Sequence, residues 1–517
     1  MDAIELSLFS NRLAAVCSEM GAILQRAAFS PNIRDRLDYS CAVFDVNGAL
    51  CAQAAHIPVH LGSMAYAMQS IIRRFDWQPD DMVIVNDPYL GGTHLPDVTF
   101  ISPVINNGKL LAFVANRAHH ADIGADSPGS MPISASLEEE GLIIPPSYIV
   151  RQGQLQDEML GKLVGATRQP QTMQGDIAAQ MSANRTGCQR LAEMINALNI
   201  GGEPAFTMAL DALNDYAERL ARPVYEKIPN GQYRFTDYMD DDGQGQQNIP
   251  ITACVTVQGS QIDVDFNGTA AQVAGNINCP LSVAAAAVYY VFRCLLPAHT
   301  PACAGSFRAI HLHAPDQCLV NASRPAAVAA GNVETSTRIV DVVIGALLQA
   351  IPDKLAAASH GSMNNVAMGF VGDSEQAAWD YYETIGGGMG ASANTQGLSA
   401  LQTHMTNTLN TPVEVLETSY PLRIKQYAIR KGSGGAGKNS GGDGIVREYE
   451  FTHEASVTLL TERRSTAPWG VEKGGEAQRG KNSLNKKELP AKISMQVKQG
   501  DRLKIETPGG GAWGVFE

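Results

Sequence analysis

Apolar residues recur along this chain at two spacings, and these spacings predict an alternation of helices and strands. Over residues 1–28 they return every three or four positions, which is typical of an amphipathic helix. Short runs of apolar and β-branched residues predict strands at 37–44, 49–54 and 82–85. A second helical pattern covers 62–75. The N-terminal part of the chain is therefore expected to combine both kinds of element.

A β-hairpin is the clearest single element. Residues 98–105 form an apolar, β-branched run, and residues 109–116 form its return strand. Between them, Asn106, Asn107 and Gly108 predict a tight turn, because Asn and Gly tolerate positive φ. Antiparallel pairing brings the outer ends of a hairpin together. Side chains just before the first strand and just after the second should therefore meet.

The rest of the chain separates into helical and β-rich stretches. Helical patterns dominate 155–220, strands return at 233–265, an Ala-rich helix ends the stretch 270–296, and 333–350 is predicted to be a helix. We therefore expect a mixed α/β (α+β) fold. Its expected parts are an N-terminal α/β region with a metal-bearing hairpin (1–150), a helical segment (151–225), a central α/β region (226–415) and a β-rich, glycine-punctuated C-terminal region (416–517).

Side chains that can bind metal gather at the open end of the hairpin. Asp97 comes just before the first strand, His119 just after the second, and His94 lies three residues upstream of Asp97. Two imidazoles and a carboxylate suit Zn²⁺, Mn²⁺ or Fe²⁺. His120 should face away from His119 on an extended chain, so only one of them can join Asp97. Asp122 with His120 is the competing pair, and simple turn caps are the alternative to any metal.

Three further residues are candidates for the same site. Asp38 opens an apolar strand and would add a fourth, oxygen ligand if that strand lies beside the hairpin. His56 and His60 flank an Ile-Pro-Val segment, where Pro58 favours a loop over a helix. These two histidines either line the pocket or are hydrogen-bonded loop residues, and the sequence leaves both alternatives open.

Composition excludes several classes of function. The chain has 517 residues, 44% of them hydrophobic, and a net charge of −13. This charge argues against nucleic acid as a partner, since phosphate binding needs clustered Lys and Arg. The nine cysteines form no CxxC pair and are expected to be reduced thiols of a cytoplasmic protein. We expect neither a signal peptide nor a membrane helix, because no stretch approaches ~20 continuous apolar residues.

Glycine clusters offer a possible nucleotide site, which we reject. The segment 432–439, GSGGAGKN, is close to a phosphate-binding P-loop. However, Asn439 stands where the P-loop needs Ser or Thr, and a strand follows instead of a helix. A glycine-rich connection between strands is the better interpretation. The clusters at 386–388 and 509–511 are expected to be turns, and close backbone approach to a ligand is the alternative.

Several segments together resemble the hydantoinase B / 5-oxoprolinase B family. These are RDRLDYSCAVFD, HIPVHLGSM, VNDPYLGGTHLPDV, RAHHADIG, PGSMP, EEGLIIPP, GNVETSTRIVD and SGGAGKNSGGDGIVRE, in this order over nearly the whole chain. Two positions depart from the family pattern. Ala125 follows ADIG where the family often has Gly, and Ser440 stands where it often has Arg. The second departure removes a basic contact from that loop.

The resemblance implies a metal-dependent enzyme that acts with a partner. It assigns the metal, Zn²⁺ or Mn²⁺, to Asp38, His94, Asp97 and His119, and so selects His119 over His120. The implied partner is a hydantoinase A-type, actin-like ATPase subunit, which uses the ATP, in a hetero-oligomer with two or more copies. The implied substrate is a small cyclic amide such as a hydantoin or 5-oxoproline.

The mechanism implied by the resemblance begins with the partner, which phosphorylates the amide oxygen. Hydroxide generated at the metal then attacks the activated carbon, and the ring opens with loss of phosphate. His120, Asp122 and His60 are candidates for support of the metal ligands or for proton transfer.

Two other functions compete with this interpretation. One is a subunit of an ATP-dependent ketone carboxylase, which lies within the same family. Chain length disfavours it, because the large subunits of such carboxylases carry additional segments. The other is a non-catalytic scaffold for an ATPase partner, with a purely structural metal.

Overall fold

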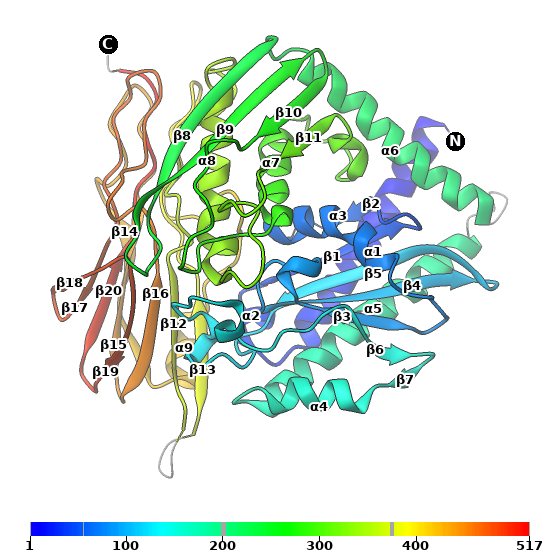
Figure 1. The fold of residues 1–517 in the computed structure, drawn as a ribbon, viewed down its shortest axis with the longest axis horizontal. Helices are drawn as coiled ribbons and strands as arrows, with labels where there is room; N and C mark the ends of the chain where they lie inside the picture. The colour runs from blue at the N-terminus through cyan, green and yellow to red at the C-terminus, as the bar shows by residue number, and fades with distance from the viewer. Residues whose placement is uncertain (1, 55, 198–202, 373–376, 516–517) are drawn as a thin grey trace.

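The computed structural model describes the chain except residues 1, 55, 198–202, 373–376 and 516–517. Figure 1 shows three neighbouring parts: an N-terminal sheet with its helices, a central sheet with two helices, and two C-terminal sheets at the opposite side. The mixed α/β fold is confirmed, because helices and several sheets occur together. The boundaries expected at 150, 225 and 415 stay predictions.

The N-terminal part is built on a seven-stranded sheet with antiparallel pairing. Its strand order is β2-β1-β5-β4-β3-β6-β7. The bounds are Tyr39–Asp45 (β1), Leu50–Gln53 (β2), Met82–Val85 (β3), Asp97–Asn106 (β4), Lys109–His119 (β5), Ser147–Arg151 (β6) and Gln154–Leu155 (β7). The predicted hairpin is β4 and β5, and the predicted strand at 37–44 is β1. Since β1 pairs with β5, the start of β1 lies beside the open end of the hairpin.

Helices cover both faces of this sheet. One face of β1 packs on α1 (Ala3–Ala27), together with α5 (Pro170–Ala197) and α6 (Glu203–Tyr225). Alternate residues of the same strand pack on α3 (Pro58–Ile72). Every residue of β1 is therefore buried, which explains its continuous apolar run. A short helix, α2 (Pro31–Arg34), precedes β1, and α4 (Asp157–Gly165) precedes α5.

Helix α3 corrects one expectation. The sequence pattern places Pro58 in a loop and begins the helix after it, whereas the helix begins at Pro58 itself. Proline suits the first helical position because its missing N–H has no partner there in any case. His60 therefore lies on a rigid helix, two residues after its start.

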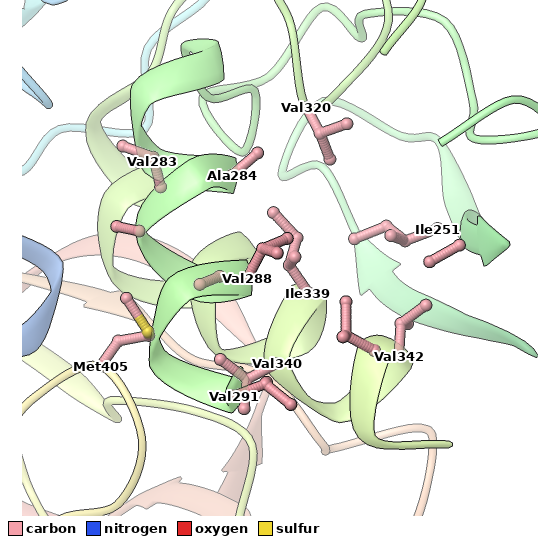
Figure 2. Packing of buried hydrophobic residues seen from close by; sticks show 14 of the residues in the cluster. Ile251, Val283, Ala284, Val288, Val291, Val320, Ile339, Val340, Val342 and Met405 are labelled. Atoms are coloured by element: carbon pink, nitrogen blue, oxygen red, sulfur yellow. The ribbon is translucent and has the colours of Figure 1, made fainter. Parts of the chain in front are cut away.

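The central part is a four-stranded sheet with two buried helices. The sheet has the order β11-β10-β9-β8, with bounds Gly231–Asp241 (β8), Gln247–Gln258 (β9), Gln261–Asp265 (β10) and Ile310–His313 (β11). Helices α7 (Leu281–Leu295) and α8 (Ser336–Leu347) pack on it. Figure 2 shows Val288 and Val291 of α7 facing Ile339 and Val340 of α8. A π-helical turn, η5 (Gly331–Thr335), leads into α8.

The C-terminal part contains two sheets around their own apolar core. One has the order β13-β12-β16-β19 and the other β14-β15-β20-β17-β18. Their bounds are Asn365–Phe370 (β12), Trp379–Glu383 (β13), Leu422–Arg430 (β14), Gly444–Phe451 (β15), Ala455–Leu460 (β16), Lys481–Leu484 (β17), Lys487–Leu489 (β18), Lys492–Val497 (β19) and Arg502–Glu506 (β20), with α9 at Val413–Ser419. The glycine-rich segment 432–439 joins two of these strands, as predicted.

Two expectations concern the whole chain. All nine cysteines are free thiols, eight of them buried or partly buried. None of the helices in the described ranges combines the length and apolar character that a membrane crossing needs.

Candidate metal centre

The hairpin brings Asp97 and His119 together. These two residues are directly opposite each other in the pairing of β4 and β5, at the open end of the hairpin. His119 Nδ1 lies 3.3 Å from Asp97 Oδ1. The two side chains are almost fully buried. This is the contact that the hairpin pattern predicted.

His94 joins them from the loop before β4. Its Nε2 lies 3.3 Å from Asp97 Oδ1. The loop turns sharply at Gly92, where an added Cβ would lie only 2.1 Å from the backbone oxygen of Asn86. One ligand atom each from His94, Asp97 and His119 lies within 4.8 Å of the others. This spacing allows all three side chains to bind a single metal ion.

A hydrogen bond at Nδ1, on the side of the ring away from the centre, fixes the orientation of His94. Its Nδ1 lies 3.0 Å from the backbone oxygen of Ala329, so Nδ1 donates a hydrogen bond and Nε2 faces the centre. Ala329 is held in turn by the buried carboxylate of Glu140, which accepts from its N–H at 2.9 Å. Metal-binding histidines commonly donate their second ring nitrogen to a carbonyl or carboxylate in this way.

Asp38 and His60 border this group of three. His60 Nε2 lies 3.2 Å from Asp97 Oδ2 and 4.0 Å from Asp38 Oδ1. The other oxygen of Asp38 lies 3.8 Å from the guanidinium of the buried Arg36. Asp38 is thus next to the centre, but outside the group whose atoms lie within 4.8 Å. His60, which the sequence left undecided, contacts Asp97 directly.

Charge in the centre favours a cation. Burial alone would raise the pKa of Asp97, but the neighbouring His60 and His94 hold it well below its usual range. Burial would lower the pKa of His94, whereas the charge of Asp97 raises it above the usual value. Burial lowers the pKa of His119. A buried carboxylate that remains ionised requires positive charge beside it.

Several polar atoms in the centre have no hydrogen-bond partner. They are Asp97 Oδ1, His119 Nε2 and Asn332 Oδ1, all buried. Unpartnered buried polar atoms are rare because each costs free energy. An oxygen and imidazole nitrogens form the donor set that Zn²⁺ and Mn²⁺ accept. The residues present therefore fit a divalent metal ion.

Asn332 is a member of this site that sequence reasoning missed. Its Nδ2 lies 3.1 Å from His94 Nε2 and 3.2 Å from Asp97 Oδ2. It belongs to the π-helical turn η5, and such turns occur frequently at functional sites. The segment GNVETSTRIVD contributed to the family resemblance, which was the only sequence signal for this residue.

Tyr382 forms a wall of the centre from the C-terminal part. Its ring stacks on His119 with 4.7 Å between the centroids. The Arg36 guanidinium lies 5.1 Å from the centroid of the same ring and donates to the Tyr382 backbone oxygen. The centre therefore joins segments that are hundreds of residues apart in the chain.

The structure does not bring His120 and Asp122 to the centre. His120 Nε2 lies 2.9 Å from the side-chain oxygen of Gln180 on α5. Asp122 accepts hydrogen bonds from the backbone of Gly124 and Arg168. Both line a separate small cavity behind the strand end. Successive side chains of a strand point to opposite faces, which separates His120 from His119.

The family model of hydantoinase B/oxoprolinase matches residues 2–515. The chain belongs to this family. An uncharacterized protein of Methanocaldococcus jannaschii, MJ0963, is 39% identical, with 99% of this chain and 91% of that protein covered. 5-Oxoprolinase 1 of Arabidopsis thaliana is 37% identical, with 99% of this chain but 42% of that protein covered. A B-type subunit of a D-/L-hydantoinase from a Pseudomonas strain is 31% identical, with 99% and 90% covered.

Two solved structures share the fold. The ATP-dependent caprolactamase of Pseudomonas jessenii superposes with a TM-score of 0.91 at 26% identity, covering all of this chain and 91% of that one. A nucleotide-free acetone carboxylase gives a TM-score of 0.87 at 16% identity, covering 99% of this chain and 76% of that one. The chain thus spans less than half of the plant 5-oxoprolinase and most of the caprolactamase chain.

Proposed function

We propose that this chain is the metal-dependent component of an ATP-dependent cyclic amide hydrolase, of the hydantoinase B type. Asp38, His94, Asp97 and His119 would hold the ion. The observation that carries the proposal is the convergence of His94, Asp97 and His119 within 4.8 Å.

The proposed partner is a hydantoinase A-type ATPase in a hetero-oligomer. The Pseudomonas relative supports such a partner, because its name describes one subunit of a hydantoinase. The nine free thiols agree with a cytoplasmic location.

The partner would use ATP to phosphorylate the oxygen of the ring amide and release ADP. Water then adds to the activated carbon, and the ring C–N bond breaks so that nitrogen leaves as an amine. A second water hydrolyses the resulting acyl phosphate to a carboxylate and inorganic phosphate. A bound divalent ion would supply Lewis acidity, which lowers the pKa of water towards ~7.

His60 is the residue we propose for proton transfer. Its Nε2 faces the carboxylates of Asp97 and Asp38, and its Nδ1 lies 3.4 Å from Ser40 Oγ. It can take a proton from the attacking water and deliver it to the leaving nitrogen. We propose a structural role for His120 and Asp122, because their hydrogen bonds to Gln180 and Arg168 already satisfy them.

Chain length favours ring opening over ketone carboxylation, because this chain covers more of the caprolactamase chain than of the acetone carboxylase chain. The chain covers 91% of the caprolactamase chain and 76% of the acetone carboxylase chain. The test combines the purified chain with its A-type partner, Mg²⁺ and ATP. It compares ADP release with cyclic amides and with ketones plus bicarbonate. We expect turnover of a cyclic amide, and turnover of ketones alone would contradict the proposal.

A His60→Gln variant tests the proton-transfer role. The glutamine retains polar contact but cannot carry a proton, so we expect ring opening to fall by about 100-fold or more. Metal content should stay at the wild-type level. His313→Gln, an exposed position on β11, is the matched control and should leave both unchanged. Full activity of His60→Gln would exclude this role.

A further inference from the structure

A cleft between α3 and α7 lies outside the metal centre. It has a volume of about 220 Å³. The two helices approach closely at Gly62, where an added Cβ would lie 2.6 Å from the Cα of Ala286. The cleft opens beside this contact, and Leu61 and Tyr290 contribute to its walls. The close packing of the two helices fixes the position of the walls that they contribute.

One wall of the cleft is aromatic. Tyr289 of α7 and Phe307 stack on each other, with 4.6 Å between the ring centroids and 14° between the planes. Both rings line the cleft, as does Leu50 of β2. Flat apolar groups pack well against such surfaces.

The same cleft contains an arginine without a counter-charge. Arg293, in the last turn of α7, lines it. Its buried Nη1 has no hydrogen-bond partner, and none of the described carboxylates forms an ion pair with its guanidinium. Burial lowers the pKa of Arg293, and no carboxylate offsets this effect. A partly buried charge without compensation costs free energy, which an incoming anion would recover.

We propose that this cleft binds a small organic carboxylate with a flat apolar body. Arg293 pairs with the carboxylate, and Tyr289 and Phe307 contact the body. The volume suits a ligand of roughly ten non-hydrogen atoms. Such a ligand would also touch Pro58 and Leu61 of α3, the helix whose His60 faces the metal centre. The cleft is therefore a second ligand site, distinct from the one in which the cyclic amide reacts.

Calorimetric titration of the full chain with benzoate tests this site. Benzamide has the same shape without the charge, and inorganic phosphate has charge without the apolar body. We expect benzoate to bind about tenfold more tightly than either, because only benzoate satisfies both the guanidinium and the aromatic wall. Equal binding of benzoate and benzamide, or no measurable binding of benzoate, would overturn the proposal.

Two variants locate the binding. Arg293→Gln removes the charge, and Ala65→Leu reduces the cleft volume from α3 while the arginine itself is retained. Each should weaken benzoate binding by about tenfold or more while the thermal unfolding curve shows a folded protein. Arg12→Gln, an exposed arginine of α1, removes the same charge elsewhere and should leave binding unchanged. Unchanged binding in both cleft variants would contradict the assigned location.

Discussion

Asp97 is the residue on which the candidate metal centre depends. Its two oxygens receive contacts from His60, His94, His119 and Asn332, each from a different segment of the chain. Its own side chain is fully buried. A carboxylate in this position keeps its negative charge only because cationic or cation-binding groups surround it. Removing that charge would leave the histidines without the group that orders them.

Glu334 is linked to the centre through a chain of hydrogen bonds that includes Asn365 and Tyr382. Its Oε1 accepts from Asn365 Nδ2 at 2.6 Å, and Asn365 Oδ1 accepts from the hydroxyl of Tyr382 at 2.6 Å. Tyr382 stacks on His119. Burial, with a further contribution from Glu462, raises the pKa of Glu334 to about 8 from an ordinary value of 4.5.

This pKa shift predicts a pH dependence of stability. The folded state holds the Glu334 proton more tightly than the unfolded state does, so this group destabilises the fold as pH rises from about 5 to about 8. In Glu334→Gln this loss is absent, a difference on the order of a few kcal/mol at the upper end. In scanning calorimetry, the Tm of Glu334→Gln should fall less than the Tm of wild type as the pH rises. Glu138→Gln, at an exposed position within η3 (Leu137–Glu140), is the control. Parallel profiles for Glu334→Gln and wild type would contradict the assignment.

At the scale of elements, the hairpin and the π-helical turn carry the site. The hairpin was predictable because its turn residues and its two strands are adjacent in the sequence. The turn η5 was not, since a π-helical turn has no spacing signal of its own. Helix α3 was only partly predicted because Pro58, which breaks helices in their interior, begins this one.

The glycine clusters allow separate segments of the chain to pack closely. At Gly388 an added Cβ would lie 1.9 Å from the backbone oxygen of Gly442, and at Gly441 it would lie 1.8 Å from that of Gly510. Three segments therefore pack backbone against backbone, with no space for side chains between them. Residues 386–388 and 509–511 were expected to be turns, with close approach to a ligand as the alternative. The structure shows close approach to neighbouring backbone segments, and approach to a ligand stays a prediction.

A Gly388→Ala variant tests this packing. The added methyl group requires the backbone of the neighbouring segment to move, so we expect a loss of about 3 kcal/mol or more in the free energy of unfolding. Gly161→Ala lies in α4 with no atom within 4 Å of the added Cβ. This control should be neutral or slightly stabilising, because alanine favours helices. Equal thermal stability of the two variants would contradict the close packing.

At the scale of the whole molecule, the sequence indicated which residues could bind metal. It gave less information on how the fold brings these residues together. Asp97 and His119 belong to one hairpin, so local pairing rules predicted their contact, and His94 lies only three residues before Asp97. Asp38, His60 and Asn332 come from separate elements, and only the tertiary packing determines their distances to that hairpin. For this reason the sequence could not show that His60, and not His120, lies beside the candidate metal centre.

We propose that this centre holds a divalent ion and that the ion is needed for ring opening. The most direct test measures metal content by mass spectrometry after reconstitution with Zn²⁺ or Mn²⁺, in wild type and in His94→Ala. We expect about one ion per chain in wild type. We expect His94→Ala to lose both the ion and ring opening, while it still folds and assembles with the partner. Equal metal content in both proteins would contradict the account, and unfolding or dissociation of His94→Ala would indicate a structural metal in a scaffold.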